Sequence, residues 1–200
     1  MPDAFPLLRS RLLTGLCLTL VCAGVAASPG AGEPVPEGRT LPDMLMNGLN
    51  GPDRSLASYS GRKLIINIWA SWCTPCRAEA ASLERFAWSE AGSRYAVIGI
   101  STDDDRRAAE RWLKQSNATL NHYLDRAVVL ENMLGASRIP LTVLVDEHGR
   151  VITRVRGAQA WDAPEMLQLI EKAFAQGTRP RPRKVQDALP VPQKAMSAPR

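Results

Sequence analysis

Cys73 and Cys76 are separated by two residues, a spacing at which two thiols can form and break a disulfide. Pro75 lies between them, and proline is tolerated in a first helical turn because its missing N–H would have no partner there. The residues that follow keep helical spacing, which places Cys73 at the N-terminal edge of a helix and Cys76 in its first turn. That position favours a thiolate. We therefore predict that Cys73 is the nucleophile and Cys76 the resolving thiol.

Two other interpretations of this pair stay open. A C-x-x-C pair is half of a zinc site, but no second pair is expected in the mature chain and His122 and His148 are isolated in the sequence. A purely structural disulfide would close a very short loop and constrain the unfolded chain little. Both interpretations are weaker than redox chemistry, and no resident metal is predicted.

The elements that position the cysteines follow from the hydrophobic pattern. Residues 64–69 are an apolar, branched run, typical of a strand covered on both faces. Strands then alternate with helices, which indicates an α/β sandwich around a mixed sheet. The expected strands are 41–46, 55–59, 64–69, 95–101, 122–124, 139–146 and 151–155, and the expected helices start after 73, after 105, at 128 and at 163.

Three consecutive acidic residues, Asp103, Asp104 and Asp105, precede one of these helices. Aspartate is favoured at a helix N-cap and in the first helical turn. A metal site at this run would need further ligands at loop spacing, and the sequence offers none there. We therefore interpret the run as a helix start.

The N-terminus has the pattern of an export signal. Two arginines precede an apolar run that is short for a membrane span, and small residues follow it. We predict a signal peptide over residues 1–27, whose removal takes Cys17 and Cys22 with it. An uncleaved anchor, or a lipoprotein with lipid on Cys22, is the alternative. A single pair of closely spaced cysteines in an oxidising compartment indicates a redox-active function rather than a structural one.

The remaining chain divides by composition into three parts. Residues 28–39 form a flexible lead-in, 40–177 a single domain, and 178–200 a disordered tail rich in proline and basic residues. The net charge of +5 therefore describes the tail and not the domain. Such a tail can contact an anionic membrane surface. The domain has no basic face, so nucleic acid is not an expected partner.

The motif Trp72-Cys73-Thr74-Pro75-Cys76 after a buried strand, with Ile139-Pro140 ahead of a later strand, resembles the thioredoxin superfamily. More narrowly, the chain is similar to the exported TlpA/ResA group of thiol–disulfide oxidoreductases, over about residues 40–174. The resemblance implies a three-layer thioredoxin fold with a mixed sheet, an N-terminal β extension and an inserted strand and helix. It also implies a redox-active Cys73–Cys76 disulfide and no cofactor.

By the same resemblance, Ile139-Pro140 is the cis-proline turn that lies against the cysteines. The backbone of Ile139 would then pair with an incoming polypeptide, and Pro140, which has no N–H, would keep the cysteines from holding a metal. Trp72 is the other residue assigned to substrate binding. An ordinary trans proline at a strand entrance is the alternative.

Glu79 matches the buried acidic residue of the TlpA/ResA pattern, where it helps to move the proton of the second thiol. A partly buried carboxylate has a raised pKa and can act as a base for Cys76. Glutamate in a first helical turn is also favourable without any chemistry. Asn67 occupies the place of the buried aspartate of cytoplasmic thioredoxins, which makes Glu79 the expected proton handler.

The direction of electron flow is predicted to be reductive. A histidine between the cysteines would stabilise the thiolate and make the disulfide more oxidising, and this chain has Thr74-Pro75 there. The resemblance implies a periplasmic monomer that reduces exported proteins, such as apocytochrome c or a copper-site protein, with electrons from a membrane thiol transporter.

Two other functions use the same cysteines. One is a module that holds Cu(I) between two soft thiolates and delivers it to a partner. The other is a peroxidase of the peroxiredoxin kind, which needs a threonine shortly before its reactive cysteine. Ile68, Trp69 and Ala70 occupy that region instead.

Overall fold

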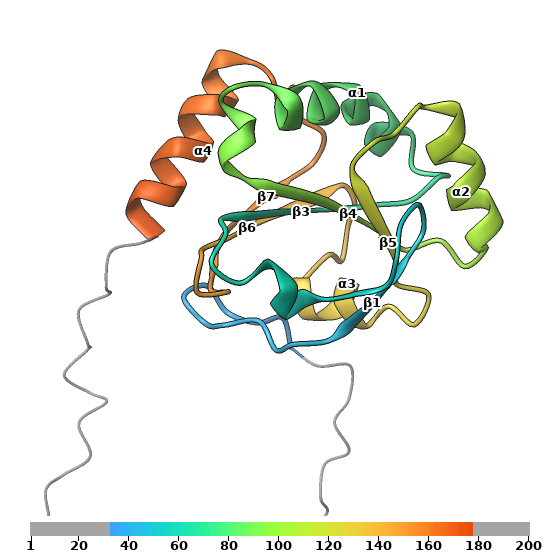
Figure 1. The fold of residues 1–200 in the computed structure, drawn as a ribbon, viewed down its shortest axis with the longest axis horizontal. Helices are drawn as coiled ribbons and strands as arrows, with labels where there is room; N and C mark the ends of the chain where they lie inside the picture. The colour runs from blue at the N-terminus through green and yellow to red at the C-terminus, as the bar shows by residue number, and fades with distance from the viewer. Residues whose placement is uncertain (1–32, 178–200) are drawn as a thin grey trace, which may run out of the picture. The chain divides into compact units, whose positions relative to one another are not determined.

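A computed structural model describes residues 33–177 of the 200-residue chain. They form a seven-stranded sheet in the order β2-β1-β5-β4-β3-β6-β7 (Figure 1). The predicted signal peptide and basic tail lie outside the described residues. The strands are β1 Leu45–Gly48, β2 Arg54–Ser55, β3 Leu64–Trp69, β4 Ala96–Ser101, β5 Asn121–Leu124, β6 Leu141–Val145 and β7 Val151–Arg156.

Strand β3 is the centre of the sheet. All six of its residues are buried, as its unbroken apolar pattern predicts. It pairs in parallel with β4 and antiparallel with β6, so the sheet is mixed as expected. The register pairs Trp69 with Ser101, and β3 and β4 therefore end together at one edge of the sheet. The chain leaves β3 at this edge to enter the cysteine motif.

Two layers of helix cover the sheet. Figure 1 shows α1 (Thr74–Trp88), α2 (Arg106–Gln115) and α4 (Pro164–Gly177) over one face, and α3 (Val129–Leu134) with the N-terminal segment over the other. Alternate side chains of β3 pack on opposite faces of the sheet. Ile66 and Ile68 pack in the α3-side core, and Ile65 packs in the core formed with α4. The three-layer thioredoxin fold is confirmed.

The helix ends confirm most of the local predictions. Asp105 caps α2 by accepting a hydrogen bond from the backbone N–H of Arg107 at 2.9 Å. Helix α3 ends at Gly135, whose φ of 77° is the left-handed conformation that favours glycine. Among the described residues, no helix is both long and apolar enough to cross a bilayer.

One prediction about the N-terminal part of the domain was wrong in detail. The strand expected at 55–59 is instead β2 followed by a 3-10 helix, η1 (Leu56–Tyr59). The start of η1 is stabilised by two side chains, since Asp43 and Ser55 both accept a hydrogen bond from the N–H of Ala57. Within the segment predicted as a lead-in, the N–H of Val35 donates a hydrogen bond to the Met133 carbonyl at 2.9 Å.

Candidate active site

Cys73 and Cys76 are joined by a disulfide, with their Cα atoms 5.3 Å apart. Cys73 is the N-cap of α1, and its Sγ accepts a hydrogen bond from the backbone N–H of Cys76 at 3.2 Å. The predicted placement at the helix start is therefore confirmed. Both cysteines are buried, Cys73 with 4% and Cys76 with 2% of its surface exposed. A thiolate at the N-cap can accept hydrogen bonds from the backbone N–H groups of the first helical turn, which have no partner within the helix.

The turn between β3 and α1 is anchored by Asp103, which the sequence suggested only as part of a helix start. This buried carboxylate accepts hydrogen bonds from the Ser71 N–H at 2.9 Å and the Ser71 hydroxyl at 2.6 Å. It also accepts one from the Ser101 hydroxyl at 2.7 Å. Since Ser71 lies two residues before Cys73, these bonds fix the chain that presents the nucleophile. Only Asp105 of the acidic run caps the helix.

The Ile139–Pro140 peptide bond is cis, as the resemblance implied. Ile139 is partly buried and packs against the apolar cluster that contains both cysteines. Trp72 stands out from the surface with 69% of its area exposed. The structure thus brings Ile139 to the apolar cluster that contains the disulfide, and it leaves the Trp72 ring exposed next to Cys73 in the sequence. The assignment of Ile139, Pro140 and Trp72 to substrate binding stays a prediction.

Glu79 lies on α1, one turn after Cys76, and is 3% exposed. Its Oε1 accepts a hydrogen bond from the Asn67 amide at 2.8 Å. Its Oε2 accepts from the Gln159 N–H at 3.0 Å and from the Trp161 indole at 3.1 Å. Burial raises the pKa of Glu79 above its ordinary value, and these three donors oppose the shift. The site therefore holds a carboxyl group able to exchange a proton beside the resolving cysteine.

Sequence reasoning missed the partners of this carboxyl group. Gln159 and Trp161 lie in the segment between β7 and α4, about eighty residues from Glu79 in the sequence. Trp161 is fully buried, which is unusual for a residue in a polar connecting segment. A single tryptophan in this connecting segment was the one sequence feature that could have indicated a buried contact.

His122 is the other residue whose contacts the sequence did not indicate. It lies on β5, and its Nδ1 accepts a hydrogen bond from the Trp69 indole N–H at 3.1 Å. The Trp69 ring also contacts Trp112 of α2, with ring centroids 4.6 Å apart. Among residues 33–177 no group of three or more His, Cys, Asp or Glu side chains could hold a metal ion.

A mixed, helix-flanked sheet with a disulfide at the start of the helix after its central strand defines a thioredoxin-fold thiol–disulfide oxidoreductase. The chain belongs to the Redoxin family, whose model matches residues 31–170.

Named relatives agree with this class. The chain is 31% identical to the thiol:disulfide interchange protein DsbE of Vibrio cholerae, over 86% of this chain and 94% of that protein. It is 24% identical to the thiol-disulfide oxidoreductase ResA of Bacillus subtilis, over 74% of this chain and 86% of that one. The exposed lipoprotein thioredoxin Etrx1 of Streptococcus pneumoniae superposes with a TM-score of 0.58 at 25% identity, over 66% of this chain and 99% of that one. The chain is thus a thiol–disulfide oxidoreductase of the ResA/DsbE kind.

Proposed function

We propose that this protein works in the periplasm and reduces disulfides of exported proteins. The observation that carries the proposal is a disulfide whose first cysteine, Cys73, caps the helix that follows the central strand. In the reduced protein the Cys73 thiolate attacks one sulfur of the substrate disulfide and releases the other as a thiolate. Cys76 then attacks Cys73, which frees the second substrate thiol and leaves the Cys73–Cys76 disulfide.

This cycle moves two electrons and two protons to the substrate. Cys76 must lose its proton to attack, and Glu79 is the buried carboxyl group on the same helix face, one turn away. Burial raises the pKa of Glu79, which makes it a stronger base than an ordinary carboxylate. The substrate thiolates are protonated when they leave. The oxidised pair is then reduced again by a dithiol, for which we propose a membrane thiol transporter.

The surface beside the disulfide supports a polypeptide substrate. The exposed ring of Trp72 and the cis turn at Ile139–Pro140 offer an apolar contact and a backbone edge to an extended polypeptide. We propose apocytochrome c or a copper-site protein as the substrate, with the protein acting as a monomer and its basic tail contacting the anionic membrane.

The proposal is tested by trapping substrates in the native host. A Cys76→Ser variant cannot resolve the mixed disulfide, so it should accumulate exported proteins covalently bound to Cys73. Cys73→Ser, which keeps the other thiol, is the matched control and should accumulate none. A small set of trapped proteins that includes a membrane thiol donor supports reduction.

A broad set of folding clients would indicate an oxidase and contradict the proposed direction. Equal, low trapping by both variants, together with tight Cu(I) binding by the reduced protein, would favour the copper-holding function instead.

A further inference from the structure

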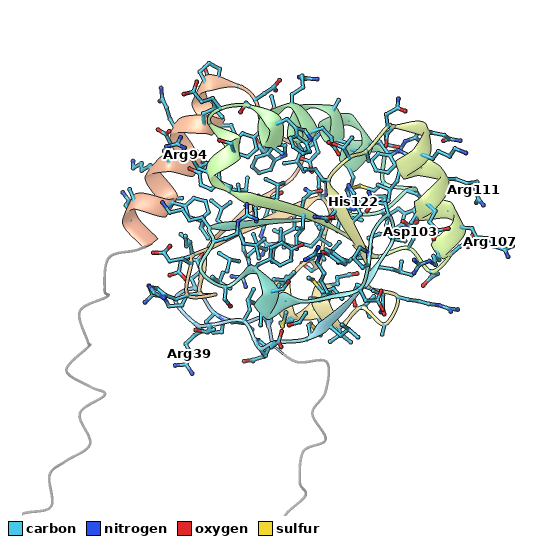
Figure 2. The ribbon with its side chains drawn as sticks, viewed as in Figure 1. Arg39, Arg94, Asp103, Arg107, Arg111 and His122 are labelled. Atoms are coloured by element: carbon cyan, nitrogen blue, oxygen red, sulfur yellow. A yellow bond between two sulfur atoms is a disulfide. The ribbon has the colours of Figure 1, made fainter. Side chains whose placement is uncertain are left out.

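The turn between β4 and α2 carries a buried carboxylate, Asp103, that no step of the proposed redox cycle uses. Figure 2 shows this side chain in the interior of the domain, beside the start of α2. Only 3% of its surface is exposed. A charged group leaves water at a cost, unless hydrogen bonds or an opposite charge replace the water. The groups around Asp103 therefore decide what its charge does.

All hydrogen-bond partners of this carboxylate are donors. The Ser71 N–H and the Ser101 hydroxyl donate to its Oδ2, at 2.9 and 2.7 Å, and the Ser71 hydroxyl donates to its Oδ1 at 2.6 Å. The Ser101 oxygen also accepts the Asp103 N–H at 3.1 Å, which orients the hydroxyl. An ionised carboxylate only accepts, whereas a protonated carboxyl group has a proton of its own to donate. The contacts thus match the charged form.

The negative charge of Asp103 has no cation beside it within the described part of the chain. It belongs to none of the ion pairs found there. Arg106, the first residue of α2, pairs instead with Glu110 at 2.7 Å. Figure 2 shows Arg107 and Arg111 pointing from α2 into solvent. The charge is therefore not cancelled locally, and its burial limits screening by salt.

The carboxylate of Asp103 is also close to Cys73. Ser71 lies two residues before this cysteine, and the Ala70 carbonyl accepts the Cys73 N–H at 3.1 Å, so the chain forms a tight turn. Since two residues span at most about 7 Å, the carboxylate lies within about 10 Å of the Cys73 backbone. At an effective dielectric constant of about 20, one negative charge disfavours another at this distance by about tenfold. Asp103 therefore opposes the helix start, which favours the thiolate.

The other groups that pack around the cysteine pair leave this effect in place. Helix α2 contributes three side chains that do not ionise, Ala109, Trp112 and Leu113. The buried His122 ring is neutral at physiological pH, because burial lowers its pKa to about 4. On α1, Arg77 is exposed and Glu79 is held by its own three donors. Both are unchanged in every variant proposed below, so neither causes a difference between variants.

We infer that Asp103 is a positioning residue that sets the reactivity of Cys73. Through Ser71 it holds the turn that presents the thiol, and its charge makes the thiolate less favourable than the helix start alone would. A less stabilised thiolate gives a more reducing pair, so Asp103 lowers the reduction potential of the Cys73–Cys76 disulfide. This role rests on the proposed role of Cys73 as the nucleophile, and it holds for either direction of electron flow.

Asp103→Asn removes the charge with little change of shape. The pH midpoint of Cys73 alkylation by iodoacetamide in the reduced protein, followed by mass spectrometry, measures how readily this thiol ionises. In the variant the midpoint should fall by about one pH unit, which corresponds to the tenfold effect. The reduction potential should become less negative by up to about 30 mV, because a tenfold change in a two-electron equilibrium corresponds to about 30 mV.

Two control variants separate the buried charge from the acidic run and from the hydrogen bonds. Asp104→Asn removes the same charge from the exposed neighbouring residue and should leave both values unchanged. Ser71→Ala removes one hydrogen bond to Asp103 but keeps the charge, and it should not lower the midpoint. An unchanged or higher midpoint in Asp103→Asn would overturn the inference. An equal downward shift in either control would do the same.

The parent protein provides a test that does not depend on the folding of a variant. When Cys73 ionises in the reduced protein, the ¹³C signal of the Asp103 carboxylate should shift with the same pH midpoint as the alkylation. In the oxidised protein, which has no thiol to ionise, this shift should be absent. A signal that ignores the ionisation of Cys73 would overturn the inference. Substrate trapping by Cys76→Ser does not depend on these midpoints, so a failure of the proposed function is distinguishable.

Discussion

Lowering the pH from 7 to 4 should destabilise the fold through His122. The buried ring is held neutral, with its pKa lowered from 6.5 to about 4 by burial, and Glu84 only partly opposes the shift. Because the folded-state pKa is depressed, the unfolded chain takes up a proton below pH 6.5 that the folded chain takes up only near pH 4. Stability present above pH 6.5 is therefore lost as the pH falls through this window.

The size of the effect follows from the two values. The pKa of His122 differs by about 2.5 between the unfolded and the folded chain, and one pH unit corresponds to about 1.4 kcal/mol. The free energy of unfolding should therefore be about 3 kcal/mol lower at pH 4 than at pH 7. Urea unfolding monitored by tryptophan fluorescence measures the free energy of unfolding at each pH. Other groups titrate in the same pH interval, so the parent must be compared with a variant that lacks only the His122 imidazole.

His122→Gln is the matched control. Its side-chain oxygen can accept the Trp69 indole N–H, and it does not titrate. Between pH 7 and pH 4 the parent should lose about 3 kcal/mol more than the variant. If both proteins lost the same stability, His122 would not be a buried neutral ring.

Three further predictions concern the active site. Asp103→Asn keeps one acceptor for Ser71 but loses the charge, and it should lower the free energy of unfolding by about 1–3 kcal/mol in urea, whereas an unchanged value would show that this anchor is dispensable. Because burial raises the pKa of Glu79, the parent should lose stability as the pH rises above 4.5 and through the folded-state value. Glu79→Gln should not show this loss, and parallel pH profiles would refute the assignment. In the reduced protein iodoacetamide should modify Cys73 faster than Cys76 at pH 7, as mass spectrometry of the digested product can show, and equal rates would contradict the N-cap argument.

Elements with a strong local pattern were predictable from the sequence. The unbroken apolar run over 64–69 indicates a central strand, and proline after Cys73 indicates the helix start. Gly135 marks a helix end because it can adopt a positive φ. The 3-10 helix at η1 was not predictable, since it depends on Asp43, which lies twelve residues before the Ser55 that it contacts.

The chemistry of the site was predictable only in part. The cysteine pair and Glu79 are local to one helix, and their spacing is readable from the sequence. The hydrogen bonds that hold Glu79 come from Gln159 and Trp161, which only the tertiary fold brings near. His122 was predicted to be isolated, but its unpaired Nε2 and its contact with Trp69 depend on which strands become neighbours. Long-range pairing leaves no signature in local composition.

The reduction potential of the Cys73–Cys76 pair tests the central claim most directly. Equilibration of the protein with mixtures of reduced and oxidised dithiothreitol, followed by alkylation and mass spectrometry, gives this value. A disulfide reductase with no histidine between its cysteines should have a potential near that of reducing thioredoxin-fold proteins, about −270 mV. A potential near that of strongly oxidising ones, about −120 mV, would contradict the account.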